Sequence, residues 1–185
     1  MKTSIVLACV AAAAVSTPSL VDAHGYMMLP KAQLASGDPT RYATTIRGPN
    51  ALKVPAGGSF SSSPQVNVDS FTKAFKASGL SSLKALIEKA APSTPACGIT
   101  PPGGAPQDVP DHVEWSAFAD SHVGPCEVWC DNTRVFQEAN CAGRYPSRPA
   151  RLPINKAQCS NAKQMKIIWL ALHSQDWQST AVSKE

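Results

Sequence analysis

The residue of greatest chemical interest in this chain is His24, because of the segment that precedes it. Lys2 is followed by an apolar run at 5–15 and by a polar stretch that ends in Val21-Asp22-Ala23. This layout is typical of a secretory signal peptide (residues 1–23), and cleavage after Ala23 would make His24 the first residue of the secreted protein. An N-terminal histidine offers a metal ion two nitrogens, its imidazole and its α-amine. The α-amine loses its proton at mild pH because its reference pKa is about 7.7–8.0.

Three further histidines are candidates to complete a metal site. His122 stands in a predicted turn between two strands, which is a rigid and exposed platform for a ligand. His173 ends an apolar segment, where it could be either a core histidine or a group beside a metal. His112 begins a strand after a Pro-Asp pair, and we expect it to have a surface role. One amine and two imidazoles form a T-shaped set of three nitrogens, which suits copper better than zinc because zinc prefers a tetrahedron of four ligands.

The composition predicts a small secreted protein with one domain. The apolar run of the leader is shorter than the ~20 residues that cross a bilayer, and no later segment is long enough. Residues 24–185 suffice for one domain with its own core. The net charge of +4 suits an acidic polymer or surface. The basic residues form no dense block, so we expect a monomer with no nucleic-acid or membrane partner.

The cysteines indicate disulfides. One of the six belongs to the predicted leader, and no C-x-x-C pair that would suggest zinc is present. If 126–130 is one strand, Cys126 and Cys130 lie about 13 Å apart at ~3.3 Å per residue, beyond the ~7 Å limit for a bridge. The other pairings stay open, and an odd number leaves one thiol unpaired. The cysteines after the leader are Cys97, Cys126, Cys130, Cys141 and Cys159.

Apolar periodicity predicts few helices and several short strands. Two helices are expected, at 68–77 and 82–90, separated at Gly79 and with Ser81 or Ser82 as the cap of the second. The expected strands are His112–Ala119, Cys126–Cys130, Thr133–Gln137 after an Asp131-Asn132 turn, and the buried central strand Met165–Leu172. The segments without regular structure are 24–66, 91–110 and 144–153. Short strands, long loops and few helices favour a mainly β fold of the sandwich type.

Three segments together resemble the lytic polysaccharide monooxygenases. They are HGYMMLPKAQ at 24–33, DSHVGPCEVWCD at 120–131 and ALHSQDWQ at 171–178. The chain is most similar to auxiliary activity family 17, a secreted group associated with cleavage of homogalacturonan, the backbone of pectin. The resemblance covers nearly the whole chain from His24 to about Gln178.

The resemblance implies an immunoglobulin-like (fibronectin-like) β-sandwich with a flat copper-binding face. His24 and His122 would be the metal ligands, forming a histidine brace around one copper ion. His173 and Gln178 would complete the catalytic site as groups that handle the oxygen species. The implied activity is oxidative cleavage of plant cell-wall polysaccharide, with an external reductant and O2 or H2O2 as co-substrate. Polymer contacts are expected from Tyr26, Lys31, Arg41 and Arg47.

The chain departs from this pattern at its end. The superfamily places Tyr or Phe two residues after the glutamine, where the aromatic side chain fills the axial position of copper. Here Gln178 is followed by Ser179 and Thr180. We therefore expect 179–185 to be an aberrant or truncated end that leaves the last strand without a closing partner and a cysteine unpaired.

Two other classes of function are compatible with the residues. The missing axial aromatic favours a copper-binding or carrier protein that holds the metal in the same brace without cleaving polysaccharide. A cysteine-stapled secreted binding protein without a metal is the third class. Glycoside hydrolysis is poorly supported, because it needs paired carboxylates and no acidic pair stands in a comparable context.

Overall fold

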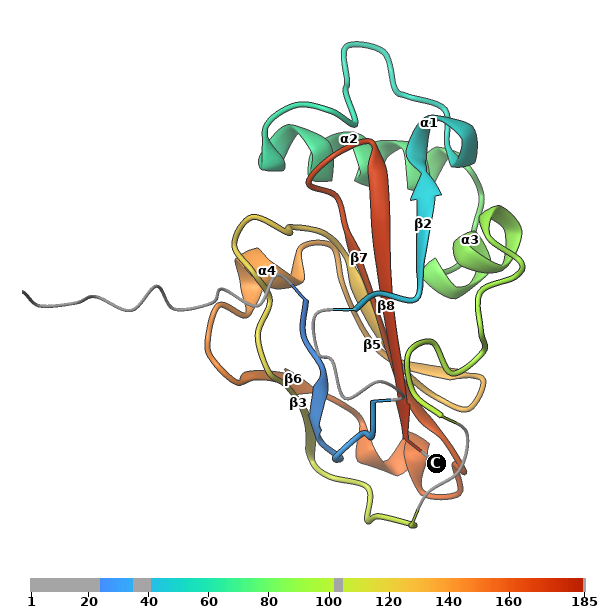
Figure 1. Cartoon of the computed structure of the whole chain (residues 1–185), viewed down its shortest axis with the longest axis vertical. Helices are drawn as coiled ribbons and strands as arrows, with labels where there is room; N and C mark the ends of the chain where they lie inside the picture. Colours follow the sequence, from blue (N-terminus) through green and yellow to red (C-terminus); the bar gives the residue numbers. More distant parts are fainter. Residues whose placement is uncertain (1–23, 35–40, 102–104, 185) are drawn as a thin grey trace, which may run out of the picture.

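The fold is mainly β, with two antiparallel sheets and a few short helices (Figure 1). The computed structural model describes residues 24–34, 41–101 and 105–184, so the predicted signal peptide lies outside the described residues. The strands are β1 (Met27–Leu29), β2 (Thr44–Arg47), β3 (His112–Trp115), β4 (Cys126–Cys130), β5 (Thr133–Glu138), β6 (Ala150–Pro153), β7 (Met165–Ala171) and β8 (Asp176–Lys184). The helices are α1 (Gly48–Ala51), α2 (Pro64–Ala77), α3 (Leu83–Ala90) and α4 (Cys141–Arg144), with a 3-10 turn at Lys156–Cys159.

The larger sheet has the order β2-β8-β7-β4-β5, and the smaller has the order β1-β3-β6. Side chains alternate between the two faces of a strand, and both faces of β7 are covered. Ile167 and Trp169 face a core that also contains Trp115 and other residues of the small sheet. Ile168 and Leu170 face a second core formed with the helices. This double burial explains why the predicted central strand is a continuous apolar run apart from Lys166.

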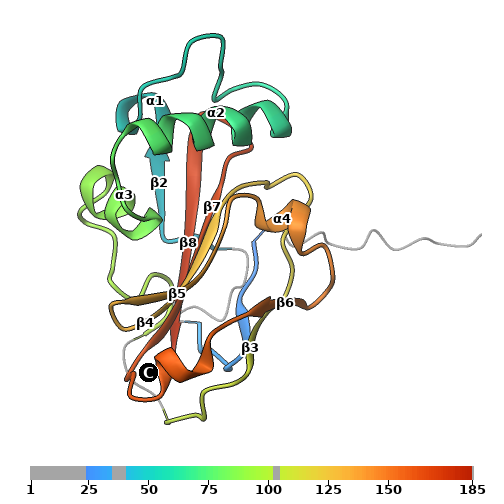
Figure 2. The ribbon, with the colours of Figure 1, turned by 180° about the vertical axis from the view of Figure 1, so that it is seen from behind.

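The helices cover the second face of the large sheet. In Figures 1 and 2, α2 lies across one end of this sheet and α3 lies beside β2. Phe71 of α2 and Leu86 of α3 are buried in the core that contains Trp177 of β8. Ser82 caps α3 by accepting a hydrogen bond from the Ala85 amide, as the sequence predicts. Within the described ranges, no helix combines the length and the apolar character needed to cross a membrane.

Two disulfides connect β4 of the large sheet to α4 and to the 3-10 turn. Cys126 pairs with Cys141, and Cys130 pairs with Cys159, with Cα–Cα distances of 5.9 and 5.4 Å. The expectation that Cys126 and Cys130 do not pair with each other is confirmed. Cys97 is the free cysteine of the described residues.

Several strands were missing from the sequence-based prediction. β1 and β2 lie in the segment expected to be irregular, and β6 lies in the proline-rich loop at 144–153. β1 and β6 have only three and four residues, and both pair with β3, a strand remote from them in sequence. Such short strands carry too few residues for a periodic pattern.

The expectation that the last strand has no closing partner is wrong. β8 pairs with β7 along its length, from Gln178 opposite Ala171 to Lys184 opposite Met165. Its first half also pairs with β2 on the other side. The predicted strand 112–119 is shorter than expected, because β3 ends at Trp115.

Candidate functional site

The structure brings together three histidines from distant segments at one end of the large sheet. The rings of His24 and His122 have their centroids 5.2 Å apart at an interplanar angle of 75°. The rings of His122 and His173 are 4.3 Å apart. His24 precedes β1, His122 lies in the loop before β4, and His173 lies two residues after the end of β7.

Backbone hydrogen bonds hold these segments in place. The His122 amide donates to the Ala119 carbonyl at 2.9 Å, which closes the predicted turn. The Leu172 amide donates to the Val123 carbonyl at 2.8 Å, so the His122 loop and the end of β7 are tied together. On the other side, the buried side chain of Asn67 in α2 donates to the Leu172 carbonyl at 2.8 Å. This last residue was not identified from the sequence.

Gln178, the fourth predicted site residue, contacts His24 directly. Its Oε1 lies 2.8 Å from His24 Nε2. An amide oxygen only accepts, so Nε2 of His24 carries the proton and Nδ1 keeps its lone pair. Nδ1 is also the ring nitrogen nearer to the backbone nitrogen of the same residue. An α-amine at His24, formed by cleavage after Ala23, would therefore close a chelate ring with Nδ1.

The second imidazole is positioned by its sequence neighbour. Nδ1 of His122 lies 2.9 Å from the hydroxyl oxygen of Ser121. When Nδ1 donates to this hydroxyl, Nε2 of His122 keeps the lone pair that a metal needs. A hydrogen bond to the non-ligating nitrogen is the usual way in which proteins orient a metal-binding histidine.

The electrostatics of the cluster favour neutral rings at His122 and His173. Burial, with further contributions from His173 and His24, lowers the pKa of His122 from 6.5 to about 4. Burial and the neighbouring His24 also lower the pKa of His173. His122 is therefore neutral at pH 7, and a metal ion does not have to displace a proton from the lone-pair nitrogen.

Aromatic rings surround the cluster. The buried ring of Trp169 lies 6.4 Å from both the His24 and the His122 rings. The ring of Tyr42 lies 5.3 Å from His24 and is 40% exposed. Tyr42 was not identified from the sequence, since nothing in its spacing from His24 indicates a contact.

Position 180, where the family pattern places an aromatic residue, is occupied by a buried threonine. Thr180 lies opposite Trp169 in the sheet and is 1% exposed. In the part of the chain that the structure describes, its hydroxyl has no hydrogen-bond partner, and neither does Nε1 of Trp169. The departure from the family pattern is therefore accommodated by a small side chain within the sheet.

The other candidates lie elsewhere or on the surface. His112 is on the small sheet, where it contacts Glu114 and Arg151. Among the expected polymer contacts, three side chains are exposed and Tyr26 is half-buried. The exposed ones are Lys31, Arg41 and Arg47. Arg47 forms two 3.0 Å hydrogen bonds with the carboxylate of Asp176.

The donor set fits a brace in which one nitrogen comes from the main chain. Among the described residues, no group of three or more His, Cys, Asp or Glu side chains is arranged to hold a metal ion. The brace requires only two side chains, His24 and His122, because its third nitrogen is the α-amine. The two facing rings, each with a hydrogen-bond partner at the other nitrogen, are compatible with this arrangement.

No protein-family model matches the chain, and no curated protein matches it significantly. The interpretation of the site therefore depends on its own residues and on the motifs that carry the resemblance.

Proposed function

We propose that this protein is a secreted, copper-dependent lytic polysaccharide monooxygenase with an immunoglobulin-like β-sandwich fold. Its proposed substrate is plant cell-wall polysaccharide, with homogalacturonan as the first candidate. The observation that carries this proposal is the 5.2 Å separation of the His24 and His122 rings, with His173 and Gln178 directly beside them.

The proposed ligands are the α-amine and Nδ1 of His24 and Nε2 of His122. Three nitrogens in a T-shaped arrangement suit copper, which accepts square or tetragonal geometry and has the highest affinity among the divalent first-row metals. The chemistry that copper supplies when bound is one-electron redox chemistry with O2 or H2O2, driven by an external reductant. Oxidation of a sugar carbon at the glycosidic link would then break the polymer.

The residues of this chain have separate roles in the proposed reaction. Gln178 holds the His24 ring in one orientation, and Ser121 does the same for His122. Burial and the neighbouring His24 lower the pKa of His173, so its ring stays neutral and can donate a hydrogen bond beside the proposed metal site. The buried ring of Trp169 lies 6.4 Å from the rings of both proposed ligands, so the cluster has an apolar neighbour on the side of the core.

The charge of the protein supports an acidic polymer as substrate. The net charge of +4 attracts a polyuronate over long range. Tyr42 is exposed beside His24, and an aromatic ring in this position offers a sugar an apolar contact. Lys31 and Arg41 are exposed basic side chains that could contact the carboxylates of the polymer.

The second candidate function is a copper carrier without polysaccharide-cleaving activity. The observation that favours it is Thr180, which is buried where the family pattern requires an aromatic residue. A carrier needs the brace but not the axial aromatic or the polymer-binding face. The two functions therefore predict the same copper affinity and differ in the products.

The test uses protein secreted with its native N-terminus. We expect one tightly bound Cu(II) per chain when His24 is the first residue. Retention of Ala23 or the substitution His122→Ala should each weaken Cu(II) binding by more than about 100-fold, since losing a ligand costs more than losing a supporting hydrogen bond. Unchanged affinity in both variants would rule out the brace.

The activity test adds homogalacturonan, ascorbate and a trace of peroxide to the copper-loaded protein. Mass spectrometry should detect oxidised oligosaccharides, which should be absent without copper or without reductant. If copper binds normally and no pectic, cellulosic or chitinous polymer yields oxidised products, the carrier function is favoured.

A further inference from the structure

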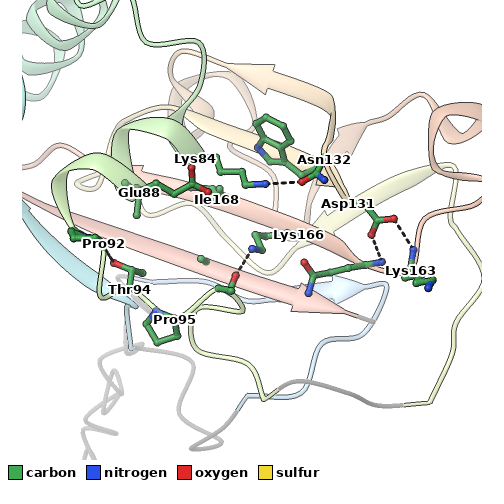
Figure 3. A pocket seen from close by; sticks show the side chains of 16 residues that line it. Lys84, Glu88, Pro92, Thr94, Pro95, Asp131, Asn132, Lys163, Lys166 and Ile168 are labelled. Atoms are coloured by element: carbon green, nitrogen blue, oxygen red, sulfur yellow. Dashed lines mark hydrogen bonds between the residues drawn. The ribbon is translucent and has the colours of Figure 1, made fainter.

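A second candidate binding site lies on the opposite face of the large sheet. A cavity of about 690 Å³, which we call the α3 pocket, is bordered by α3, the loop at 91–96, the β4–β5 turn and parts of β7 and β8 (Figure 3). Ile168 lies in its wall, whereas the adjacent Trp169 points to the other face, toward the histidines. The pocket is therefore separated from the histidine cluster by the sheet itself.

The pocket has an apolar floor and an aromatic side. Ile87, Ile168 and Ala181 form apolar parts of the wall, and Trp129 borders them. Trp129 is half-buried, whereas the chain's other three tryptophans are 0% exposed. An indole beside an open cavity offers a ligand apolar contact at a low cost in conformational entropy.

Three lysines line the pocket, and the ammonium groups of Lys84 and Lys166 have neutral hydrogen-bond partners. Lys84 donates to Asn132 Oδ1 at 3.0 Å and lies 5.4 Å from the centre of the Trp129 ring. Lys166 donates to the Ala96 carbonyl. Lys163 is exposed at the rim. Among the described residues, none of the three forms an ion pair with a carboxylate.

The acidic residues of the lining do not cancel this charge. Asp131 accepts hydrogen bonds from the backbone amides of Lys163 and Gln164, at 3.1 and 2.9 Å. These bonds hold its carboxylate against the backbone. Glu88 is exposed. Three ammonium groups and two carboxylates leave the lining with a positive balance.

The ammonium group of Lys166 is partly buried, and burial destabilises its charged form. Burial lowers the pKa of Lys166 below its ordinary value of 10.5, with a smaller contribution from Lys84, and the opposing contributions of Cys97 and Glu88 offset only part of this shift. A carboxylate that entered the pocket would restore the electrostatic stabilisation that the ammonium loses on leaving water.

We propose that the α3 pocket binds a short acidic saccharide, of the uronate class. The volume lies within the range of about 300–1,000 Å³ that is typical of small-molecule sites. The ammonium groups of the lysines can bind the carboxylates of the sugar. The amide of Asn132 can form hydrogen bonds with its hydroxyl groups, and the ring of Trp129 can pack against its apolar C–H face. Binding at this pocket needs no metal and does not depend on the proposed oxidative function.

The test is a titration of metal-free protein with tri-galacturonate. Fluorescence should report binding, because Trp129 is the tryptophan that solvent can reach. The substitution Lys84→Gln should weaken binding about tenfold, the effect of losing one charge-assisted hydrogen bond. The matched control is Lys89→Gln, which makes the same change at an exposed residue of the same helix, outside the pocket. It should change the dissociation constant less than about twofold.

Further measurements keep the proposal falsifiable. Lys163 is exposed, so Lys163→Gln should weaken binding without affecting folding, even if Lys84→Gln is unstable. Equal binding of neutral galactotriose would contradict the role of the lysines. Equally strong displacement of tri-galacturonate by citrate would contradict recognition of a sugar. The proposal is overturned if Lys84→Gln and Lys163→Gln bind tri-galacturonate as tightly as the control variant does. Any binding would then occur elsewhere on the protein.

Discussion

The imidazole of His24 donates a hydrogen bond from Nε2 to Oε1 of Gln178, across 154 positions of the sequence, at 2.8 Å. This contact joins the start of the described chain to β8. It also sets the tautomer of His24, because the amide oxygen only accepts. One side chain on β8 therefore decides which nitrogen of His24 remains available to a metal.

This contact predicts an effect of Gln178 on copper binding. The substitution Gln178→Ala removes the acceptor, so the His24 ring loses its fixed orientation and copper affinity should fall about 10–100-fold, as for other partners of metal ligands. The EPR spectrum of bound Cu(II) should change as well. Gln175→Ala is the matched control, because Gln175 is half-buried like Gln178 and lies just before β8 in the β7–β8 connection. Equal affinities of the two variants would show that Gln178 does not orient the ligand.

The low pKa of His122 predicts that acid destabilises the metal-free protein. The ring has a pKa of about 4 in the folded protein and 6.5 as the reference value. Between these values the unfolded chain binds more protons, so the free energy of unfolding should decrease as the pH falls from about 6.5 to 4. Carboxylates also titrate in this range. The measurement is therefore the difference in pH dependence between the native protein and His122→Gln, in which the decrease should be smaller.

Thr180 predicts a stabilising substitution. Its buried hydroxyl has no partner among the described residues, so Thr180→Val removes an unsatisfied polar group at almost constant volume. We expect a gain of about 1 kcal/mol in the free energy of unfolding, or about 2–4 °C in melting temperature. Thr45→Val, at an exposed position of β2, should change little. A lower melting temperature for Thr180→Val would show that the hydroxyl is satisfied in solution.

The disulfide pattern predicts one reactive thiol among the described residues. Cys97 is free and only half-buried, whereas the cysteines at 126, 130, 141 and 159 are paired. Alkylation of the folded protein followed by mass spectrometry should label Cys97 alone, and Cys97→Ser should leave the melting temperature nearly unchanged. Cys141→Ser should lower the stability by about 2–5 kcal/mol, the usual cost of losing a native disulfide. Labelling at Cys126 or Cys141 in the unmodified protein would contradict this pairing.

The sequence by itself determined the elements whose signals are local. The α3 helix follows from an apolar repeat and a serine cap at Ser82. The β4–β5 hairpin follows from two short strands around Asp131-Asn132, and Asp131 has the left-handed φ of 50° that such a turn accepts. The motifs also selected His24, His122, His173 and Gln178, which the structure brings together.

The tertiary structure decided what depends on contacts between distant segments. β1 and β6 are too short to show a pattern, and they exist because β3 supplies their hydrogen bonds. The partners of the cysteines and the contact of Tyr42 with His24 depend on how the chain folds back on itself. Local sequence patterns report interactions within a few residues. Strand pairing, disulfide geometry and the grouping of lysines around a cavity are set by the packing of the two cores, which no short window contains.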